Sequence, residues 1–290
     1  MTDNLLEYRR KMMEVESGES VRRESPSKRK TMTREEREPV VKPPPVPEEF
    51  DCPPEIGGVP IPSMNESREK GEKDQAEEER RRVFDLALKI EQWGRDPWAW
   101  LRECVRTQDE ADENARVKPF PNKEYLEHTV RVWQREPILA IPKSRRMVAT
   151  WLMIALHLHK ALFFPRSAIF IQSKKEEDSD FLLGPHRMLF IYHNLPPNVP
   201  WPRVKKKYAN LAFDNGSYVK GIAQGADQLR QYTASAILCD EMAFWEDAES
   251  TWTSLKPTIQ GGGKVTMVSS AQPGFFQRIV EGRLRDVTGH

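Results

Sequence analysis

Two short stretches of the sequence combine residue types that handle phosphate chemistry, and the first runs from residue 138 to residue 151. It reads ILAIPKSRRMVATW. Its apolar beginning predicts a buried strand from Ile138 to Ile141, and the amphipathic pattern of residues 150–164 predicts a helix after a polar turn. The N-terminus of a helix presents unpaired backbone N–H groups and the positive end of the helix dipole, so a cationic loop there is suited to hold phosphate. The cations of this loop are Lys143, Arg145 and Arg146.

The common phosphate-binding loop has the pattern G-x-x-x-x-G-K-[ST], and this chain matches only its last position, Thr150. Val148 stands at the second glycine, Ala149 at the lysine and Lys143 at the first glycine. On this pattern alone, an exposed helix cap or a simple anion patch is the alternative to a nucleotide site.

The second stretch is a pair of adjacent carboxylates, Asp240 and Glu241. They follow the apolar run Ala236–Cys239, which predicts another buried strand. At the carboxyl end of a central strand beside the phosphate loop, Asp240 could hold a magnesium-bound water, and Glu241 could activate the water that attacks a terminal phosphate. Asp-Glu pairs also cap helices, so the pair indicates this chemistry only together with the loop.

The surrounding pattern predicts the elements that would position these stretches. Apolar runs at residues 167–172 and 265–268 predict two more strands, and Asn215 with Gly216 forms a hairpin signal between two short apolar runs. Strands that alternate with helices indicate a parallel or mostly parallel sheet. The last strand leads into small residues, which could sense a phosphate or simply satisfy a strand end. These are Ser269, Ser270 and Ala271.

Composition divides the chain into three parts. The 290 residues are 38% hydrophobic and 31% charged with a net charge of +1, which gives no overall attraction to nucleic acid. Three scattered cysteines are too few for a disulfide framework or a zinc site, and the longest apolar stretch is too short to span a membrane. Charge runs and a proline tract predict a disordered or extended arm over residues 1–80. Residues 81–136 predict a helical lead-in, with Asp96 as the N-cap of a helix that begins at Pro97, and residues 137–290 an α/β core.

Four segments, in their order and spacing, resemble the ATPase domain of the large terminase subunits of tailed phages. They are DPWAWLRECVRTQDEADENARVKPFPNKEYL, ILAIPKSRRMVATW, AILCDEMAFW and VTMVSSAQPG. The likeness covers about residues 90–282. The phosphate loop resembles a variant Walker A motif of that family, K-S-x-R-x-x-x-[ST], in which the lysine stands first. The residues that match it are Lys143, Ser144, Arg146 and Thr150.

The resemblance implies a P-loop ATPase of the additional-strand, catalytic-glutamate type, with a mostly parallel central sheet flanked by helices, over residues 137–290. Lys143 would contact the terminal phosphates of ATP, and Thr150 would hold Mg²⁺ together with Asp240, the Walker B aspartate. Glu241 would be the catalytic base. The full nucleotide-binding set would be Pro142, Lys143, Ser144, Arg145, Arg146, Met147, Val148, Ala149 and Thr150, with Tyr125 stacking on the base.

Two further roles follow from the resemblance. Arg230 precedes Asp240 by ten residues, where terminases of this type place an arginine that reaches the neighbouring subunit's nucleotide. Arg145 and Arg146 compete for the same catalytic role within the subunit. The coupling motif that links hydrolysis to DNA movement would be Ser269, Ser270 and Ala271.

By the same resemblance, the chain is expected to translocate viral double-stranded DNA into a procapsid. Its partners would be DNA, the portal protein and the small terminase subunit. It would act in the host cytoplasm, transiently at the portal vertex. We expect a homo-oligomeric ring, a pentamer on the portal and a monomer in isolation. Family members usually continue into an RNase H-like nuclease domain, and this sequence stops at His290, so we expect DNA movement without cleavage.

Two alternatives stay open. A helicase-like P-loop ATPase has related loop and strand chemistry, and a non-catalytic assembly module could use the loop as a passive anion site. Adenine selectivity is also open, because Leu126 follows Tyr125 where the family often has glutamine.

Overall fold

The computed structural model describes residues 64–109, 112–144, 147–225, 227, 229 and 232–282, with side chains from residue 73 onward. Residues 82–282 belong to one compact unit, and the part of the chain that forms the beginning of the first helix belongs to another. The predicted arm over residues 1–80 lies outside the described residues as far as residue 63. So do three predicted site residues, Arg145, Arg146 and Arg230.

The described chain contains helices and strands in alternation. The helices are α2 (Met64–Arg95), α3 (Pro97–Cys104), α4 (Glu124–Arg135), α5 (Ala149–Phe163), α6 (Glu176–Leu183), α7 (Met188–His193), the 3-10 turn η2 (Met242–Phe244), α8 (Ala248–Gln260) and α9 (Phe275–Val280). The strands are β1 (Arg106–Gln108), β2 (Val117–Pro119), β3 (Ile138–Lys143), β4 (Ala168–Ser173), β5 (Val204–Lys207), β6 (Asn210–Phe213), β7 (Tyr218–Ala223), β8 (Ala236–Asp240) and β9 (Lys264–Ser270).

Seven strands form one sheet in the order β3-β9-β8-β4-β7-β6-β5. The first five of these run parallel, and β6 pairs antiparallel with both β7 and β5. The predicted mostly parallel α/β fold is therefore confirmed. Strand β9 lies between β3 and β8, so the phosphate loop and the carboxylate pair follow strands that are separated by one other strand. Both follow the carboxyl ends of their strands, at the same edge of the sheet.

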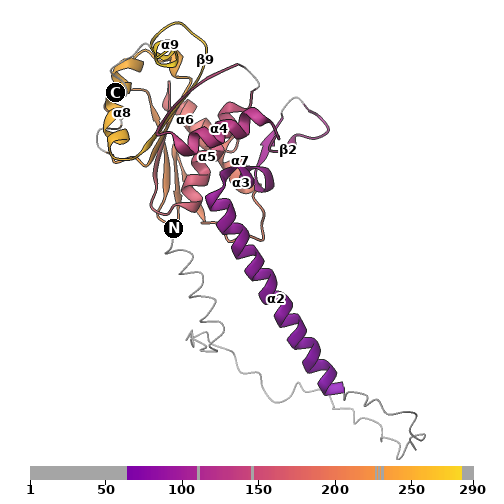
Figure 1. Ribbon diagram of the computed structural model, residues 1–290. Helices are drawn as coiled ribbons and strands as arrows, with labels where there is room; N and C mark the ends of the chain where they lie inside the picture. The colour runs from indigo at the N-terminus through magenta and orange to yellow at the C-terminus, as the bar shows by residue number, and fades with distance from the viewer. Residues whose placement is uncertain are drawn as a thin grey trace, which may run out of the picture. The chain divides into compact units, whose positions relative to one another are not determined.

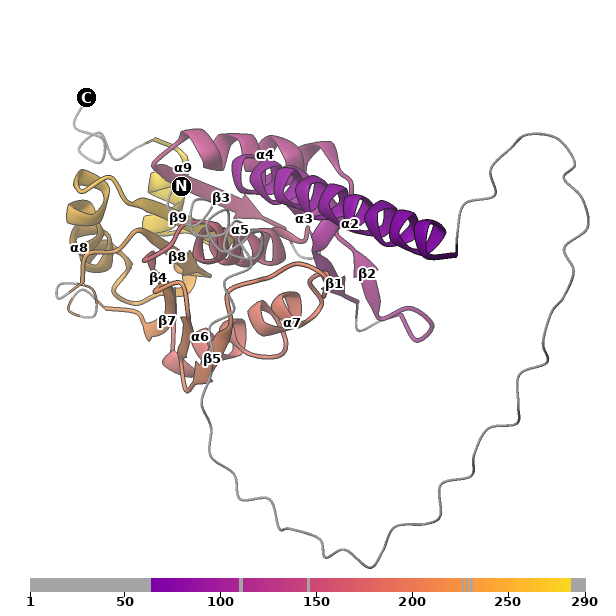
Figure 2. The same cartoon turned by 90° about the horizontal axis from the view of Figure 1, so that it is seen from below.

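Helices cover both faces of this sheet (Figures 1 and 2). Alternate strand residues face opposite sides, so Ile171 and Leu238 pack with α3 to α7, whereas Phe170 and Cys239 pack with η2, α8 and α9. The same alternation turns Asp240 toward the face that carries α5. Helix α5 is buried along most of its length beneath α3, α4 and α7, which fixes its N-terminus against the sheet.

The hairpin signal at Asn215 and Gly216 is confirmed, because β6 and β7 pair antiparallel across it and Gly216 has a left-handed φ of 84°. The sequence does not predict the strand that pairs with the other side of β6. The basic run before β6 forms the edge strand β5, which the apolar pattern of the sequence does not predict. Exposed lysines are common on edge strands because they discourage pairing with another chain. A run of lysines is therefore compatible with an edge strand.

Helix α2 begins at Met64, earlier than the boundary at residue 80 that composition indicated. The reason is local propensity, since the segment is rich in glutamate, lysine and arginine, which favour helix even without an apolar face. None of the helices in the described part of the chain combines the length and apolar character needed to cross a bilayer.

The lead-in is also not entirely helical. The acidic segment after α3 forms the turn of a two-stranded ribbon, β1 with β2. Lys118 on β2 reaches back to Asp109 at 2.7 Å and to Asp112 at 2.8 Å. The Asp112 side chain accepts hydrogen bonds from the backbone of residues 114 and 115. These contacts stabilise a turn that the acidic composition alone does not predict.

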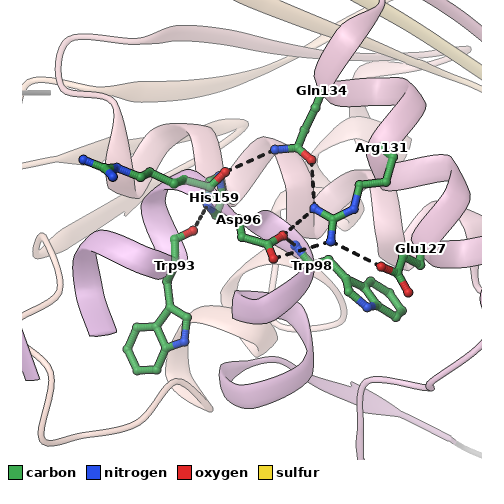
Figure 3. Close-up of polar contacts among 8 residues, drawn as sticks. Trp93, Asp96, Trp98, Glu127, Arg131, Gln134 and His159 are labelled. Carbon is green, nitrogen blue, oxygen red and sulfur yellow. Dashed lines mark hydrogen bonds and ion pairs between the residues drawn. The ribbon is translucent and has the colours of Figure 1, made fainter. Parts of the chain in front are cut away.

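A polar network fastens α4 to the junction of α2 and α3 (Figure 3). Asp96 caps α3 as predicted, since its carboxylate accepts a hydrogen bond from the Trp98 backbone at 3.0 Å. The same carboxylate pairs with Arg131 of α4 at 2.7 Å. Arg131 also contacts Glu127 at 3.2 Å and Gln134 at 3.4 Å. One side chain thus serves both as a helix cap and as an inter-helix contact.

Two histidines of α5 are fully buried in this part of the core. His157 contacts the Met153 carbonyl at 2.8 Å through Nδ1, and His159 contacts the Trp93 carbonyl at 2.8 Å through Nε2 (Figure 3). Because a carbonyl only accepts, these nitrogens carry the protons. Burial is the main cause that lowers the pKa of each histidine to about 4, so both are neutral at pH 7.

Candidate nucleotide-binding site

The loop between β3 and α5 carries backbone strain at its end. Val148, the N-cap of α5, has a φ of 59° and a ψ of 9°, which is the left-handed region. A β-branched residue rarely adopts this conformation, and glycine occupies the same place in the common phosphate loop. Such strain typically costs on the order of 1–3 kcal/mol and persists where the surrounding structure fixes the backbone. Val148 therefore has a backbone conformation that favours glycine, at the position where the common phosphate loop has one.

Lys143 is the centre of the site. Its ammonium lies 2.8 Å from the Thr150 hydroxyl, 2.7 Å from a Glu241 carboxylate oxygen and 3.8 Å from Asp240. The Lys143 and Asp240 side chains are each 13% exposed, and Glu241 is 39% exposed. A lysine at the beginning of the loop thus brings together both predicted stretches of the sequence.

Glu241 is held by the strand between the two halves of the site. It has a φ of 53° directly after β8, which turns its side chain back toward β9. There the backbone N–H of Ser270 donates to Glu241 at 3.1 Å, and the Ser269 hydroxyl donates to the same oxygen at 3.3 Å. The Ser269 hydroxyl in turn accepts from the Ala243 backbone at 3.0 Å. The end of β9 therefore positions Glu241, while Ala271, just past the strand, is exposed.

The two carboxyl groups have different protonation properties. Burial raises the pKa of Asp240 to about 6, and the charge of Glu241 adds to this, while Lys143, Thr150 and Arg187 oppose it. Burial also acts to raise the pKa of Glu241, but the hydrogen bonds from Lys143 and from Ser270 outweigh it and lower the pKa. Glu241 is therefore ionised at neutral pH, and its charge is held by Lys143.

A cavity of about 620 Å³ opens beside these groups. Pockets of this size accommodate nucleotide-sized ligands. It is lined by Lys143, Ser144, Met147, Val148, Ala149, Thr150, Trp151, Lys174, Arg187, Glu241, Phe244 and Ser270.

Four of the lining residues were missed from the sequence. Trp151 continues the first turn of α5, and Phe244 lies in η2 after the carboxylate pair. Lys174 follows the end of β4, and Arg187 precedes α7. The only signal for Lys174 was its place after a buried parallel strand, where ligands gather. Nothing in the pattern around Arg187 pointed to this cavity.

Two predicted nucleotide contacts lie at the margin. The Tyr125 ring on α4 is 43% exposed, and its hydroxyl donates to the Met147 carbonyl at 3.3 Å. Tyr125 thus contacts the loop but is not among the residues that line the cavity. Pro142 belongs to β3, where it is exposed and also outside the lining.

The donor set fits a magnesium ion shared with a nucleotide. The Thr150 hydroxyl and an Asp240 oxygen are 3.4 Å apart, and both are hard oxygen ligands. The described residues contain no group of three or more His, Cys, Asp or Glu side chains placed to hold a metal by themselves. Mg²⁺ in phosphoryl-transfer sites characteristically uses one or two protein oxygens and completes its shell with phosphates and water.

A buried hydroxyl beside Asp240 agrees with this. Gln172 of β4 is opposite Cys239 of β8, so Ser173 and Asp240 come next on these parallel strands. Ser173 is 4% exposed, and its hydroxyl has no hydrogen-bond partner within the described residues. A metal-bound water at Asp240 would offer it one.

Comparisons with known proteins give a match at the level of the fold. No protein-family model and no curated protein matches the sequence. Among solved structures, the large terminase of bacteriophage HK97 matches with a TM-score of 0.52 and 10% identity, over 68% of this chain and 41% of that protein.

Two further neighbours have lower TM-scores. The large terminase ATPase domain of Thermus phage P74-26 matches with a TM-score of 0.42 and 14% identity, over 54% of this chain and 68% of that one. The large terminase of another thermophilic bacteriophage, in complex with ATP-γ-S, matches with a TM-score of 0.40 and 16% identity, over 56% of this chain and 43% of that one. The match to the HK97 protein shows a shared α/β fold with a mostly parallel central sheet over the matched part of the chain.

Proposed function

We propose that this chain is an ATP-hydrolysing motor domain of a large terminase subunit, which translocates viral double-stranded DNA into a procapsid. One observation carries the proposal. Lys143, Thr150 and Glu241, from two distant parts of the sequence, line one cavity at the carboxyl edge of a parallel sheet, and Asp240 lies behind them, 3.4 Å from the Thr150 hydroxyl. This is the set of groups that phosphoryl transfer to water needs: a cation, two metal ligands and a base.

In the proposed reaction, Lys143 exchanges partners. Without nucleotide its ammonium is held by Glu241 at 2.7 Å. The terminal phosphates of ATP carry more negative charge and draw the ammonium toward them. Glu241 then loses the contact that lowers its pKa most, so it becomes a stronger base in the same step that fills the site. Nucleotide binding thereby switches on the base.

Thr150 and Asp240 would hold Mg²⁺, which neutralises charge on the phosphates when it is bound. Glu241 orients the attacking water and accepts its proton. The hydrogen bonds from Ser269 and Ser270 keep the carboxylate in place during this step. Because both donors belong to the end of β9, movement of Glu241 on hydrolysis would be passed to this strand and to Ala271, the proposed coupling segment.

The proposal extends to assembly. Arg230 would reach the nucleotide of a neighbouring subunit, with Arg146 as the candidate within the subunit. This makes a homo-oligomeric ring on the portal the active unit, with DNA and the small terminase subunit as partners. Its place of action would be the host cytoplasm, at the portal vertex.

ATP hydrolysis in the presence and absence of linear double-stranded DNA tests the proposal. We expect DNA to raise the rate of the wild type. The Glu241→Gln variant should bind ATP but hydrolyse it at least about 100-fold more slowly, which is the scale of general-base catalysis. Glu249→Gln is the matched control, because Glu249 is 66% exposed and pairs with Arg278 on α9. Equal hydrolysis by Glu241→Gln and the wild type would contradict the assigned base.

A further inference from the structure

Arg187 brings a second cationic element to the cavity. It is the residue before α7, beyond the break that separates α6 from α7. Its guanidinium lies over the Trp151 ring, 4.7 Å from the centroid, and 5.5 Å from the centroid of Phe181. The Nη1 atom donates to the His186 carbonyl at 2.7 Å. Two rings and one carbonyl are therefore among the groups that hold the guanidinium in place.

The ring nearest to the Arg187 guanidinium, Trp151, belongs to α5, the helix that follows the phosphate loop. Trp151 follows Thr150 in the first turn of α5, and it also makes an edge-to-face contact with Phe190 of α7 at 5.7 Å. The stacked pair of Arg187 and Trp151 thus joins α7 to the helix whose N-terminus faces the cavity. Stacking uses the face of a guanidinium and anion binding uses the N–H groups along its edge, so the two kinds of contact are compatible in one arginine.

The charges around the cavity are not equivalent. Lys143 faces the two carboxylates after β8, and Lys174 pairs with Glu246 at 3.3 Å. Arg187 reaches the lining from a different element, and arginine binds phosphate oxygens through two parallel hydrogen bonds where lysine acts as a point charge. Its rigid stacking reduces the side-chain entropy that such a contact would otherwise cost.

We propose that Arg187 contacts the terminal phosphate of the bound nucleoside triphosphate within the same subunit, and that it makes the site prefer triphosphate over diphosphate. This assignment rests on the proposed nucleotide site. It adds a cation beyond those of the loop and the residue proposed to act between subunits. It also gives α7 a direct contact with the phosphate that is lost on hydrolysis.

The test compares ATP-γ-S and ADP binding, each with Mg²⁺, for the wild type and Arg187→Ala. Hydrogen bonds to charged groups correspond to a loss of roughly 10- to 100-fold in affinity when one partner is removed. We expect that loss for ATP-γ-S and a change below about threefold for ADP, since ADP lacks the contacted group. Arg203→Ala is the matched control, because the Arg203 side chain is 92% exposed and pairs with Asp214.

Two more variants and a thermal melting curve distinguish the loss of the phosphate contact from a loss of folding. Arg187→Lys keeps the charge but loses the planar contact, so it should recover only part of the ATP-γ-S affinity. Arg187→Gln keeps the stem over Trp151 and replaces Arg187→Ala if that variant melts at a lower temperature. Equal losses for both nucleotides, or no loss for either, would overturn the assignment while leaving the nucleotide site intact. A wild type that binds neither nucleotide would overturn the proposed function and this assignment with it.

Discussion

The ammonium of Lys143 offsets the repulsion between two neighbouring carboxyl groups, Asp240 and Glu241. Asp240 and Glu241 are adjacent carboxyl groups on a partly buried edge, and the repulsion between them contributes to the raised pKa of Asp240. Lys143 contacts both, at 3.8 Å and 2.7 Å. Lys143 ends β3, and it reaches the carboxylates at the end of β8 across the one strand that lies between them, β9. The contacts of the ammonium with the two carboxyl groups depend on where it lies in space, and a lysine at the beginning of the loop can make them.

The two serines at the end of β9 offer a test of how Glu241 is positioned. Ser269→Ala removes the hydroxyl that bonds both Glu241 and the Ala243 backbone, so we expect kcat for ATP hydrolysis to fall roughly tenfold with little change in KM. Ser270→Ala is the control, because Ser270 holds Glu241 through its backbone N–H, which the substitution keeps. Similar kcat values for the two variants would contradict a positioning role for the Ser269 hydroxyl.

At the level of single residues, the sequence was enough to find groups that act through their type and spacing. Lys143, Thr150 and the carboxylate pair follow predicted strands or begin a predicted helix, and the fold brings them together. Arg187 and Phe244 could not be found in this way. Their arrival at the cavity depends on how α7 and η2 pack on the sheet, which short-range patterns do not encode.

At the level of elements, buried parallel strands were the easiest to predict, because both of their faces are apolar and each run is bounded by turn residues. The strands at residues 138–141, 167–172, 236–239 and 265–268 are all present. The order of these strands was not predictable from apolar runs, since each would fit any central position. Edge strand β5 was missed because its exposed residues do not alternate.

Substitutions of Asp96 separate two contributions to stability, the cap on α3 and the ion pair with Arg131 of α4 (Figure 3). Asp96→Ala loses the hydrogen bond to the Trp98 backbone and the pair with Arg131, and we expect about 1–3 kcal/mol of destabilisation in urea unfolding. Asp96→Asn keeps a capping oxygen and loses only the charge, so it should cost less than about 1 kcal/mol. Equal losses would mean that the cap contributes nothing measurable.

At the scale of the whole molecule, the buried histidines make stability depend on pH. The pKa of His157 and of His159 is about 4 in the folded chain and 6.5 in the reference state. The unfolded chain therefore binds more protons below pH 6.5, and stability falls as the pH drops from 6.5 toward 4. The loss should reach about 3 kcal/mol for each histidine at pH 4. Asp240, with its raised pKa, acts in the opposite sense.

Urea unfolding at pH 7 and at pH 5 measures this dependence. His159→Phe removes one titrating group but keeps a ring against Trp100 and Phe163, so the difference in stability between the two pH values should become smaller. His128→Phe is the control, because His128 is exposed on α4. An unchanged pH difference in His159→Phe would show that His159 is not the source.

The molecule as a whole combines an α/β fold similar to that of the HK97 large terminase with a loop that lacks the glycines and the lysine of the common phosphate loop. The common loop has its lysine directly before the hydroxyl residue, and here a lysine from the other end of the loop lies 2.8 Å from the Thr150 hydroxyl. This arrangement predicts a true nucleotide site. A passive anion site would use the same cations but would need neither Thr150 nor Asp240.

The most direct measurement is the affinity of the wild type for ATP-γ-S, determined by calorimetry with Mg²⁺ and with EDTA. If Thr150 and Asp240 hold the metal that joins the nucleotide to the chain, Mg²⁺ should tighten binding by about tenfold or more, which corresponds to roughly 1.4 kcal/mol. The Asp240→Asn variant should lose most of that gain. Equal affinity with and without Mg²⁺ would contradict a phosphoryl-transfer site and leave the loop as an anion-binding surface.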